Sequence, residues 1–150
     1  MHRNQNCNRY KYMDHLSAYE YLMEHEVKPS VQRLAVMDYL LVHHTHPTAD
    51  EIYSALIQKI PTLSKTTVYN TLKLFVEHGA VKMLTIDEKN AMFDADTSNH
   101  AHFLCTRCNR VYDMALNAVK LHKCVVIPEG FDVEDVAVYV RGICKACKAS

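Results

Sequence analysis

Two kinds of metal-binding side chain stand next to each other near residue 100. His100 and His102 are two residues apart, so on an extended strand both imidazoles project from the same face. Cys105 and Cys108 follow as a C-x2-C pair, a spacing at which two thiolates from one turn reach the same zinc ion. Imidazole accepts iron, zinc and manganese, whereas thiolate favours zinc. The sequence therefore predicts two adjacent metal centres of different chemistry.

A second C-x2-C pair, Cys144 and Cys147, lies near the C-terminus. If all four thiolates bind one tetrahedral zinc, the site is closed and structural, and it ties the end of the chain to residues 105–108. The alternative is two disulfides or unpaired thiols. Cys7 and Cys124 belong to no such pair, and we assign them no role.

Composition favours a folded protein without a strong overall charge. Of the 150 residues 49% are hydrophobic, and 17 basic side chains balance 17 acidic ones. The balance gives no global argument for nucleic-acid binding, so that function must depend on a local surface. We expect no signal peptide, no membrane-spanning segment and a cytosolic location, where paired cysteines bind metal more often than they form disulfides.

Periodic apolar residues predict three helices before residue 61. The first covers residues 13–26; the second follows the N-cap Ser30; the third follows Thr48, which forms a capping box with Glu51. The predicted inward positions of the second helix are Val31, Leu34, Met37 or Asp38, and Leu41. Those of the third helix are Ile52, Ala55, Leu56 and Ile60.

A fourth helix is predicted from the cap Ser64 to Gly79. At about 100° per residue, its polar face gathers Thr66, Tyr69, Asn70 and Lys73. The short turn 61–63 joins it to the third helix, as in a helix-turn-helix. The alternative is an ordinary amphipathic helix with a solvated face. Two apolar runs, 80–86 and 91–95, flank a polar turn and predict a hairpin, which completes a winged helix and favours DNA binding.

Beyond residue 93 the pattern changes to short strands. The sequence predicts an α+β protein with a winged-helix DNA-binding domain (1–93), a hinge (94–99) and a small metal-binding domain (100–150). A domain of about 50 residues usually needs a metal or a partner subunit for stability. The predicted strands are His100–Leu104, Val111–Asp113 and Val133–Arg141, with a helix at Ala115–Val125.

The histidine pair needs further ligands. Their number and identity stay open on the sequence alone, but four side chains are candidates because they lie at the hinge, on the next strand or at the end of the second helix. These are Asp94, Asp96, Asp113 and His46.

Three motifs together resemble the ferric uptake regulator (Fur) family of metal-dependent bacterial repressors. They are His46-Pro47-Thr48-Ala49-Asp50-Glu51-Ile52-Tyr53, then Ser64-x-x-Thr67-Val68-Tyr69-x-x-Leu72, then His100-x-His102-x-x-Cys105-x-x-Cys108. The resemblance runs from about residue 13 to Cys147. It implies a homodimeric, non-enzymatic repressor that binds a palindromic operator in double-stranded DNA, with residues 100–150 as the dimerisation and metal-binding domain.

The resemblance also implies the site residues. Structural zinc would be bound by Cys105, Cys108, Cys144 and Cys147, and regulatory Fe²⁺ or Mn²⁺ by His46, Asp94, His100, His102 and Asp113. Adding the motif positions to the polar helix face gives the expected DNA-binding set: Ser64, Thr66, Thr67, Tyr69, Asn70 and Lys73. A regulatory metal bound to both halves would fix the angle between them.

Within the family the peroxide-sensing branch is favoured. Asp113 and Asn70 stand where iron-uptake members usually have Glu and Arg, and Asn99 and Ala101 lack the ligands of a further metal site. In that branch peroxide oxidises a ligand histidine, here His46 or His100, and DNA is released. The alternative is a repressor that responds to Fe²⁺ or another divalent metal without sensing peroxide.

Two other function classes are compatible with parts of the sequence. His100, His102 and Asp113 form a two-histidine, one-carboxylate set that could serve an iron oxygenase or a metallohydrolase. The chain has only 3 glycines and no glycine-rich loop to shape a substrate pocket, which argues against an enzyme. A zinc-stabilised protein-interaction module without DNA binding is the other class.

Overall fold

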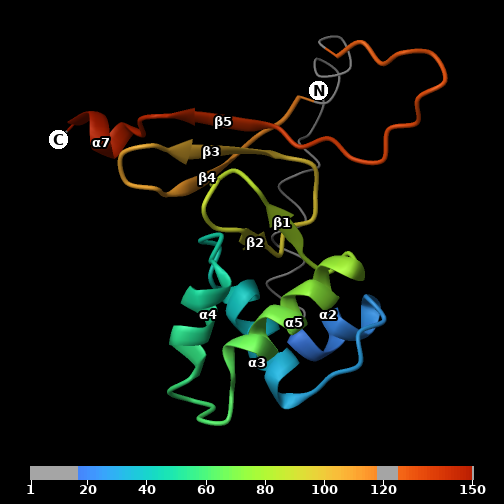
Figure 1. Ribbon diagram of the computed structural model, residues 1–150, viewed down its shortest axis with the longest axis vertical. Helices are drawn as coiled ribbons and strands as arrows, with labels where there is room; N and C mark the ends of the chain where they lie inside the picture. The colour runs from blue at the N-terminus through green and yellow to red at the C-terminus, as the bar shows by residue number, and fades with distance from the viewer. Residues whose placement is uncertain (1–16, 118–124, 150) are drawn as a thin grey trace, which may run out of the picture. The chain divides into compact units, whose positions relative to one another are not determined.

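The computed structural model describes residues 17–117 and 125–149, which form two compact units. The N-terminal unit is Met1–Ser98 and the C-terminal unit is Asn99–Ser150. In the described residues the N-terminal unit contains helices and one hairpin, and the C-terminal unit contains a three-stranded sheet followed by a short helix (Figure 1). This is the predicted α+β class.

Side-chain caps set where each helix of the N-terminal unit begins. The caps are Ser17, Ser30, Thr48 and Ser64, and each side-chain oxygen accepts a hydrogen bond from the amide three residues later. The helices that follow are α2 (Ala18–Glu24), α3 (Val31–Val42), α4 (Ala49–Leu56) and α5 (Lys65–Glu77). The helix predicted at 13–26 is therefore shorter, and residues 13–16 lie outside the described residues.

The buried face of α3 agrees with the prediction in part. Met37 is buried, and Leu34 and Leu41 pack partly buried against the core, as expected. Val36 and Leu40 are also buried, whereas Val31 is 71% exposed and Asp38 is exposed. The prediction counted from Val31, but that residue lies in the first turn after the cap, where the side chain meets solvent. In α4, Ile52 and Leu56 are buried as expected, and Ile60, which follows the helix end, packs partly buried against the core. Ala55 is exposed.

Helix α5 supplies the centre of the N-terminal core. Val68, Leu72 and Phe75 are completely buried, at the spacing of one helix face. The opposite face is exposed, as predicted, with Tyr69 52% exposed. The helix ends at Glu77, and its C-cap His78 is followed by Gly79 with a positive φ of 67°, a backbone conformation suited to glycine.

The hairpin after α5 consists of β1 (Lys82–Leu84) and β2 (Met92–Asp94), paired antiparallel. Both strands are shorter than predicted, because residues 85–91 form the connection. The other edge of β2 pairs with the entry to α4: the amide of Phe93 donates to the carbonyl of Pro47 at 3.0 Å, and Thr48 forms an antiparallel bridge with Met92. In this register His46 lies opposite Asp94.

The sheet of the C-terminal unit has the order β4-β3-β5 (Figure 1). Its strands are β3 (Ala101–Cys105), β4 (Val111–Met114) and β5 (Tyr139–Gly142), and helix α7 (Lys145–Ala149) follows. The central strand β3 is antiparallel to β4 and parallel to β5.

Three expectations for this unit need correction or fall outside the structure. A strand was predicted at Val133–Arg141, but the observed strand is Tyr139–Gly142. Its four residues are those that pair with β3, which has five residues. Val136 and Val140 are exposed instead of alternating into a core. The helix predicted at Ala115–Val125 has residues 118–124 outside the described residues, and 115–117 and 125 are not helical. Helix α7 was not predicted.

Replacing Phe75 by alanine should destabilise the N-terminal unit by about 3–5 kcal/mol, because a fully buried aromatic side chain leaves a cavity. Denaturant unfolding followed by circular dichroism measures the change. Tyr69→Ala on the exposed face of the same helix is the matched control and should change stability by about 0.5 kcal/mol or less. Equal effects of the two variants would contradict the assigned core.

Candidate metal centres

The two C-x2-C pairs converge at one end of the C-terminal sheet. Since β3 and β5 are parallel, their C-terminal ends lie at the same end of the sheet, and Cys105 is paired with Gly142. The amide of Thr106 donates to the carbonyl of Gly142 at 2.8 Å, and its hydroxyl donates to the same oxygen at 3.1 Å. The guanidinium of Arg107 donates to the carbonyl of Cys147. Backbone pairing therefore brings the two turns together.

The geometry of the four thiols matches a tetrahedral zinc site. All four sulfur atoms lie within 4.8 Å of one another, and the Sγ atoms of Cys108 and Cys144 are 3.9 Å apart. Sulfurs bound at about 2.3 Å in tetrahedral geometry are separated by about 3.8 Å. None of the four cysteines is in a disulfide. The two sulfurs thus stand at the distance that zinc coordination requires.

Hydrogen bonds distribute the thiol protons unevenly. The amide of Cys144 donates to Sγ of Cys105 at 3.4 Å, and this bond lowers the pKa of Cys105 to about 6. The hydrogen bond between the side chains of Cys147 and Cys144 raises the pKa of Cys147 to about 12. Cys105 is therefore ready to act as a thiolate, and the cluster as a whole releases protons when a metal binds.

In the C-terminal unit, two histidines share one carboxylate. His102 lies directly opposite Asp113 in the β3–β4 ladder, and His100 lies on the same side two residues earlier. The Nε2 atoms of His100 and His102 are 3.3 and 3.6 Å from Oδ1 of Asp113. Their ring centroids are 4.4 Å apart. Asp96, a candidate ligand in the sequence, lies outside this unit.

In the N-terminal unit, His46 and Asp94 form a buried pair. Their side chains are 3% and 7% exposed, and Nε2 of His46 is 3.5 Å from Oδ2 of Asp94. His46 has a positive φ of 52°, which is uncommon for a residue with a side chain and marks a locally strained backbone. The pairing of β2 with residues 47–48 holds the two side chains side by side despite that strain.

The distances between the histidine nitrogens and the carboxylate oxygens suit coordination of a shared metal better than direct hydrogen bonds. These distances are 3.3–3.6 Å, which is longer than the usual hydrogen bond. Two such atoms bound at about 2.1 Å to one ion stand about 3.0 Å apart at a right angle and about 3.4 Å apart at a tetrahedral angle. Each unit therefore presents nitrogen and oxygen atoms at separations compatible with metal coordination.

The residues expected to bind DNA divide into two groups. Ser64 and Thr67 bond to each other, with their hydroxyl oxygens 2.8 Å apart, and Ser64 also accepts from the amide of Thr67. Their hydroxyls thus help to start α5. The other four are exposed along the helix: Thr66, Tyr69, Asn70 and Lys73.

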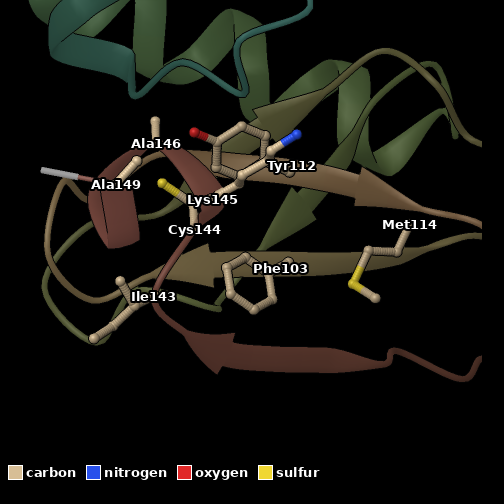
Figure 2. Close-up of a pocket in the computed structure, with 8 residues that line it drawn as sticks. All are labelled: Phe103, Tyr112, Met114, Ile143, Cys144, Lys145, Ala146 and Ala149. Atoms are coloured by element: carbon tan, nitrogen blue, oxygen red, sulfur yellow. The ribbon is translucent and has the colours of Figure 1, made fainter.

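An apolar pocket of about 710 Å³ lies beside the cysteine cluster (Figure 2). Figure 2 shows the aromatic rings of the sheet and the side chains of α7 around it. The lining residues are Phe103, Tyr112, Met114, Ile143, Cys144, Lys145, Ala146 and Ala149. Ile143 is 47% exposed and Met114 is 40% exposed. An exposed apolar area on so small a sheet indicates an interaction surface.

A helical unit with an exposed polar helix and a hairpin, followed by a sheet unit with a four-cysteine cluster, defines a metal-binding DNA-binding regulator. The sequence model of the ferric uptake regulator family matches residues 24–141. The chain belongs to that family, whose members are transcription regulators and not enzymes.

Curated relatives include two repressors from staphylococci. The peroxide-responsive repressor PerR of Staphylococcus epidermidis (strain ATCC 12228 / FDA PCI 1200) is 39% identical over 123 residues, covering 81% of this chain and 82% of that protein. The peroxide-responsive repressor PerR of Staphylococcus aureus (strain USA300) is 35% identical over 139 residues, covering 84% and 94%. The match therefore includes both units.

Solved structures of the family share the fold. The ferric uptake regulator from Pseudomonas aeruginosa with manganese superposes with a TM-score of 0.68 at 25% identity, covering 87% of this chain and 99% of that one. A zinc-bound manganese uptake regulator gives a TM-score of 0.66 at 20% identity, covering 86% and 99%. The expected fold is confirmed.

The class of function follows from the family and the metal-ligand clusters: the chain is a metal-dependent transcriptional repressor, and regulators of this family bind DNA operators as dimers. The prediction of a non-enzymatic repressor is confirmed at this level. Among the helices in the described residues, none is long and apolar enough to cross a membrane.

Cys144→Ser should abolish stoichiometric zinc binding and lower the midpoint of denaturant unfolding, because three thiolates cannot close the site. Elemental analysis of the purified protein measures the zinc. Cys7→Ser, at a cysteine outside both pairs, is the matched control and should keep the zinc content of the unaltered protein. Full zinc content in the Cys144 variant would refute the four-cysteine assignment.

Proposed function

We propose that this chain is a peroxide-responsive repressor that binds a palindromic operator as a homodimer while a regulatory Fe²⁺ or Mn²⁺ is bound. The proposed ligands are His46, Asp94, His100, His102 and Asp113. The observation that carries the proposal is the presence of an incomplete ligand set in each unit, with nitrogen and oxygen atoms spaced as they would be around one ion.

Each half of the proposed site is too small to bind a metal tightly alone. The N-terminal unit offers one imidazole and one carboxylate, and the C-terminal unit offers two imidazoles and one carboxylate. Three nitrogen and two oxygen ligands together suit Fe²⁺ or Mn²⁺. If both halves bind the same ion, occupancy fixes the angle between the units. Metal binding is then coupled to the placement of the two α5 helices of a dimer on DNA.

The cysteine cluster has a different proposed role. It lies wholly within the C-terminal unit and offers four thiolates, so zinc there would be closed and structural. The proposed structural zinc stabilises the small unit, and its loss is not part of the response to metal or peroxide.

Peroxide sensing is supported by the ligand set and by the relatives. Two relatives that match most of the chain are peroxide-responsive repressors. Bound Fe²⁺ would activate peroxide beside a ligand imidazole. One peroxide oxygen is inserted at a ring carbon of His46 or His100, that carbon supplies the two electrons that reduce the peroxide, and the other oxygen leaves as water. The altered imidazole is a poorer ligand, so the two units separate and the operator is released.

The proposed contact with DNA uses the exposed face of α5. Thr66, Tyr69 and Asn70 offer hydroxyl and amide groups to base edges, and Lys73 offers a cation to phosphate. Exposed apolar side chains of the C-terminal unit, among them Val140 and Ile143, support a second copy of this chain as the partner there. The proposed location is the cytoplasm.

His46→Ala should abolish Mn²⁺-dependent operator binding and leave the zinc content unchanged. We expect the Mn²⁺ affinity to fall by at least about a hundredfold, since loss of a residue that only orients a ligand already costs roughly 10- to 100-fold. The probe is a duplex selected from a random library by the Mn²⁺-loaded protein, measured by fluorescence anisotropy. His44→Ala, at an exposed histidine of the same turn, is the matched control. An unchanged metal response of the His46 variant would refute the proposed site.

Exposure of the Fe²⁺-loaded protein to hydrogen peroxide should add one oxygen to the peptide that contains His46 or His100. Peptide mass spectrometry measures the addition, and operator binding should fall in proportion to the modified fraction. The Mn²⁺-loaded protein is the control and should stay unmodified and bound. Loss of DNA binding without modification of either histidine, or no response at all, favours the second candidate, a repressor that responds to Fe²⁺ without sensing peroxide.

A further inference from the structure

The three residues at the end of β2 are fastened by hydrogen bonds that no part of the proposed function has used. We propose that Tyr21 and Asp96 are positioning residues for the metal ligand Asp94: their hydrogen bonds fix the backbone on which the Asp94 carboxylate is carried. The proposal rests on the proposed regulatory metal site. Every contact it uses lies within the N-terminal unit.

Tyr21 connects α2 to both ends of the hairpin. Its hydroxyl lies 2.9 Å from the carbonyl of Ala80 and 3.2 Å from the carbonyl of Ala95, so one proton is shared between two acceptors. Ala80 precedes β1, and Ala95 directly follows Asp94. Tyr21 is only 5% exposed, and both alanines are buried too, so water cannot easily replace this bond. The hydroxyl therefore restrains the peptide next to the ligand.

The amide of Asp96 holds one oxygen of the Asp94 carboxylate. It donates to Oδ1 of Asp94 at 2.8 Å, while Oδ2 of Asp94 faces Nε2 of His46 at 3.5 Å. Two atoms on opposite sides of the carboxylate thus define its rotation. Holding one oxygen by a backbone donor and presenting the other to a metal is how outer-shell hydrogen bonds orient carboxylate ligands.

The side chain of Asp96 fixes that amide in turn. Asp96 is 3% exposed, and its Oδ1 accepts from the amide of Ser98 at 2.9 Å. A buried carboxylate is costly unless hydrogen bonds compensate it, so its place here depends on the turn it closes. The turn restrains residues 96–98 and, with the Tyr21 bond, leaves the Asp96 amide little freedom to swing away from Asp94.

A purely structural role would affect folding and metal binding differently from a positioning role. If these bonds only stabilise the hairpin, their loss lowers the unfolding midpoint and leaves the Mn²⁺ affinity of the folded protein unchanged. If they position Asp94, the Mn²⁺ affinity falls while operator binding at saturating Mn²⁺ stays at the level of the unaltered protein. The two quantities are measured separately on the same full-length variants.

Tyr21→Phe removes the hydroxyl and keeps the ring. We expect Mn²⁺ affinity, measured by titration calorimetry, to fall about tenfold. In the metal-free protein the Asp96 amide should exchange with deuterium faster. Tyr39→Phe is the matched control: it makes the same change on α3, where the ring stacks on His43, and should leave both readouts unchanged. Unchanged Mn²⁺ affinity in the Tyr21 variant overturns the role of its hydroxyl.

Asp96 is tested by a pair of substitutions. Asp96→Ala removes the acceptor for the Ser98 amide and should weaken Mn²⁺ binding about tenfold, whereas Asp96→Asn keeps an oxygen at that position and should restore most of the affinity. Asp87→Ala is the matched control, because Asp87 accepts from the amide of Lys89 at 3.0 Å in the same kind of turn within the hairpin connection. It should bind Mn²⁺ normally.

The outcomes distinguish the positioning role of Tyr21 and Asp96 from the proposed regulatory metal site. If His46→Ala weakens Mn²⁺ binding but Tyr21→Phe and Asp96→Ala do not, the positioning role is wrong and the proposed site stands. If Mn²⁺ binding is insensitive to His46→Ala, the regulatory site is wrong and the positioning role falls with it. Both proposals are supported if Tyr21→Phe and Asp96→Ala weaken Mn²⁺ binding, saturating Mn²⁺ restores operator binding in both variants, and Asp96→Asn has nearly the Mn²⁺ affinity of the unaltered protein.

Discussion

The N-terminal unit depends on one short strand that is paired along both edges. On one side β2 pairs with β1, and on the other its central amide, that of Phe93, donates to the carbonyl of Pro47. This second pairing joins two segments almost fifty residues apart in the sequence and sets His46 opposite Asp94. It also accounts for the left-handed backbone of His46, since the chain must turn from the end of α3 into the pairing before α4 begins. The core around α5 supports the hairpin, but the hairpin edge aligns the two side chains.

The C-terminal unit is also organised around a strand that is paired along both edges, in this case β3. β3 carries His102 into the ladder opposite Asp113 and ends at Cys105, so a single strand contributes to both kinds of metal-ligand cluster. Its parallel partner β5 delivers the second cysteine pair to the same edge. A shift of one residue in the β3–β4 register would turn both histidines away from Asp113. The ladder hydrogen bonds therefore determine the positions of the ligands, before any metal contributes.

The sequence predicted most of what local rules govern. Ser30, Thr48 and Ser64 were recognised as caps because a side-chain oxygen three residues before an amide is a local signal. The face of α5 and the alternation of His100 and His102 followed from helix and strand periods. What could not be predicted depends on partners distant in sequence. The length of β5 is limited by β3, the burial of Val36 and Leu40 in α3 depends on the helices around it, and the pairing of Pro47 with Phe93 depends on the fold of the whole unit. Tyr21 carried no local pattern of its own, since a tyrosine in an amphipathic helix is common, and the position of Asp96 at the hinge indicated only a possible metal ligand.

The two proposed metal centres differ in whether metal binding would stabilise the fold of one unit or fix the angle between the two units. The four thiols belong to one unit whose strands already bring them together, so zinc bound there would stabilise an arrangement that the backbone has nearly fixed. The proposed histidine and carboxylate ligands belong to two units, each internally ordered but each offering too few ligands by itself. Binding free energy at a divided site is released only when the halves meet, and so it acts on the angle between units more than on their folding. A regulator needs that second property, because an ion required for folding would leave no folded, metal-free state from which DNA binding could be switched on. The proposed positioning of Asp94 within its own unit has the same effect. A side chain that is already fixed loses less conformational entropy when the metal binds, so more of the metal-binding free energy remains to close the dimer on its operator.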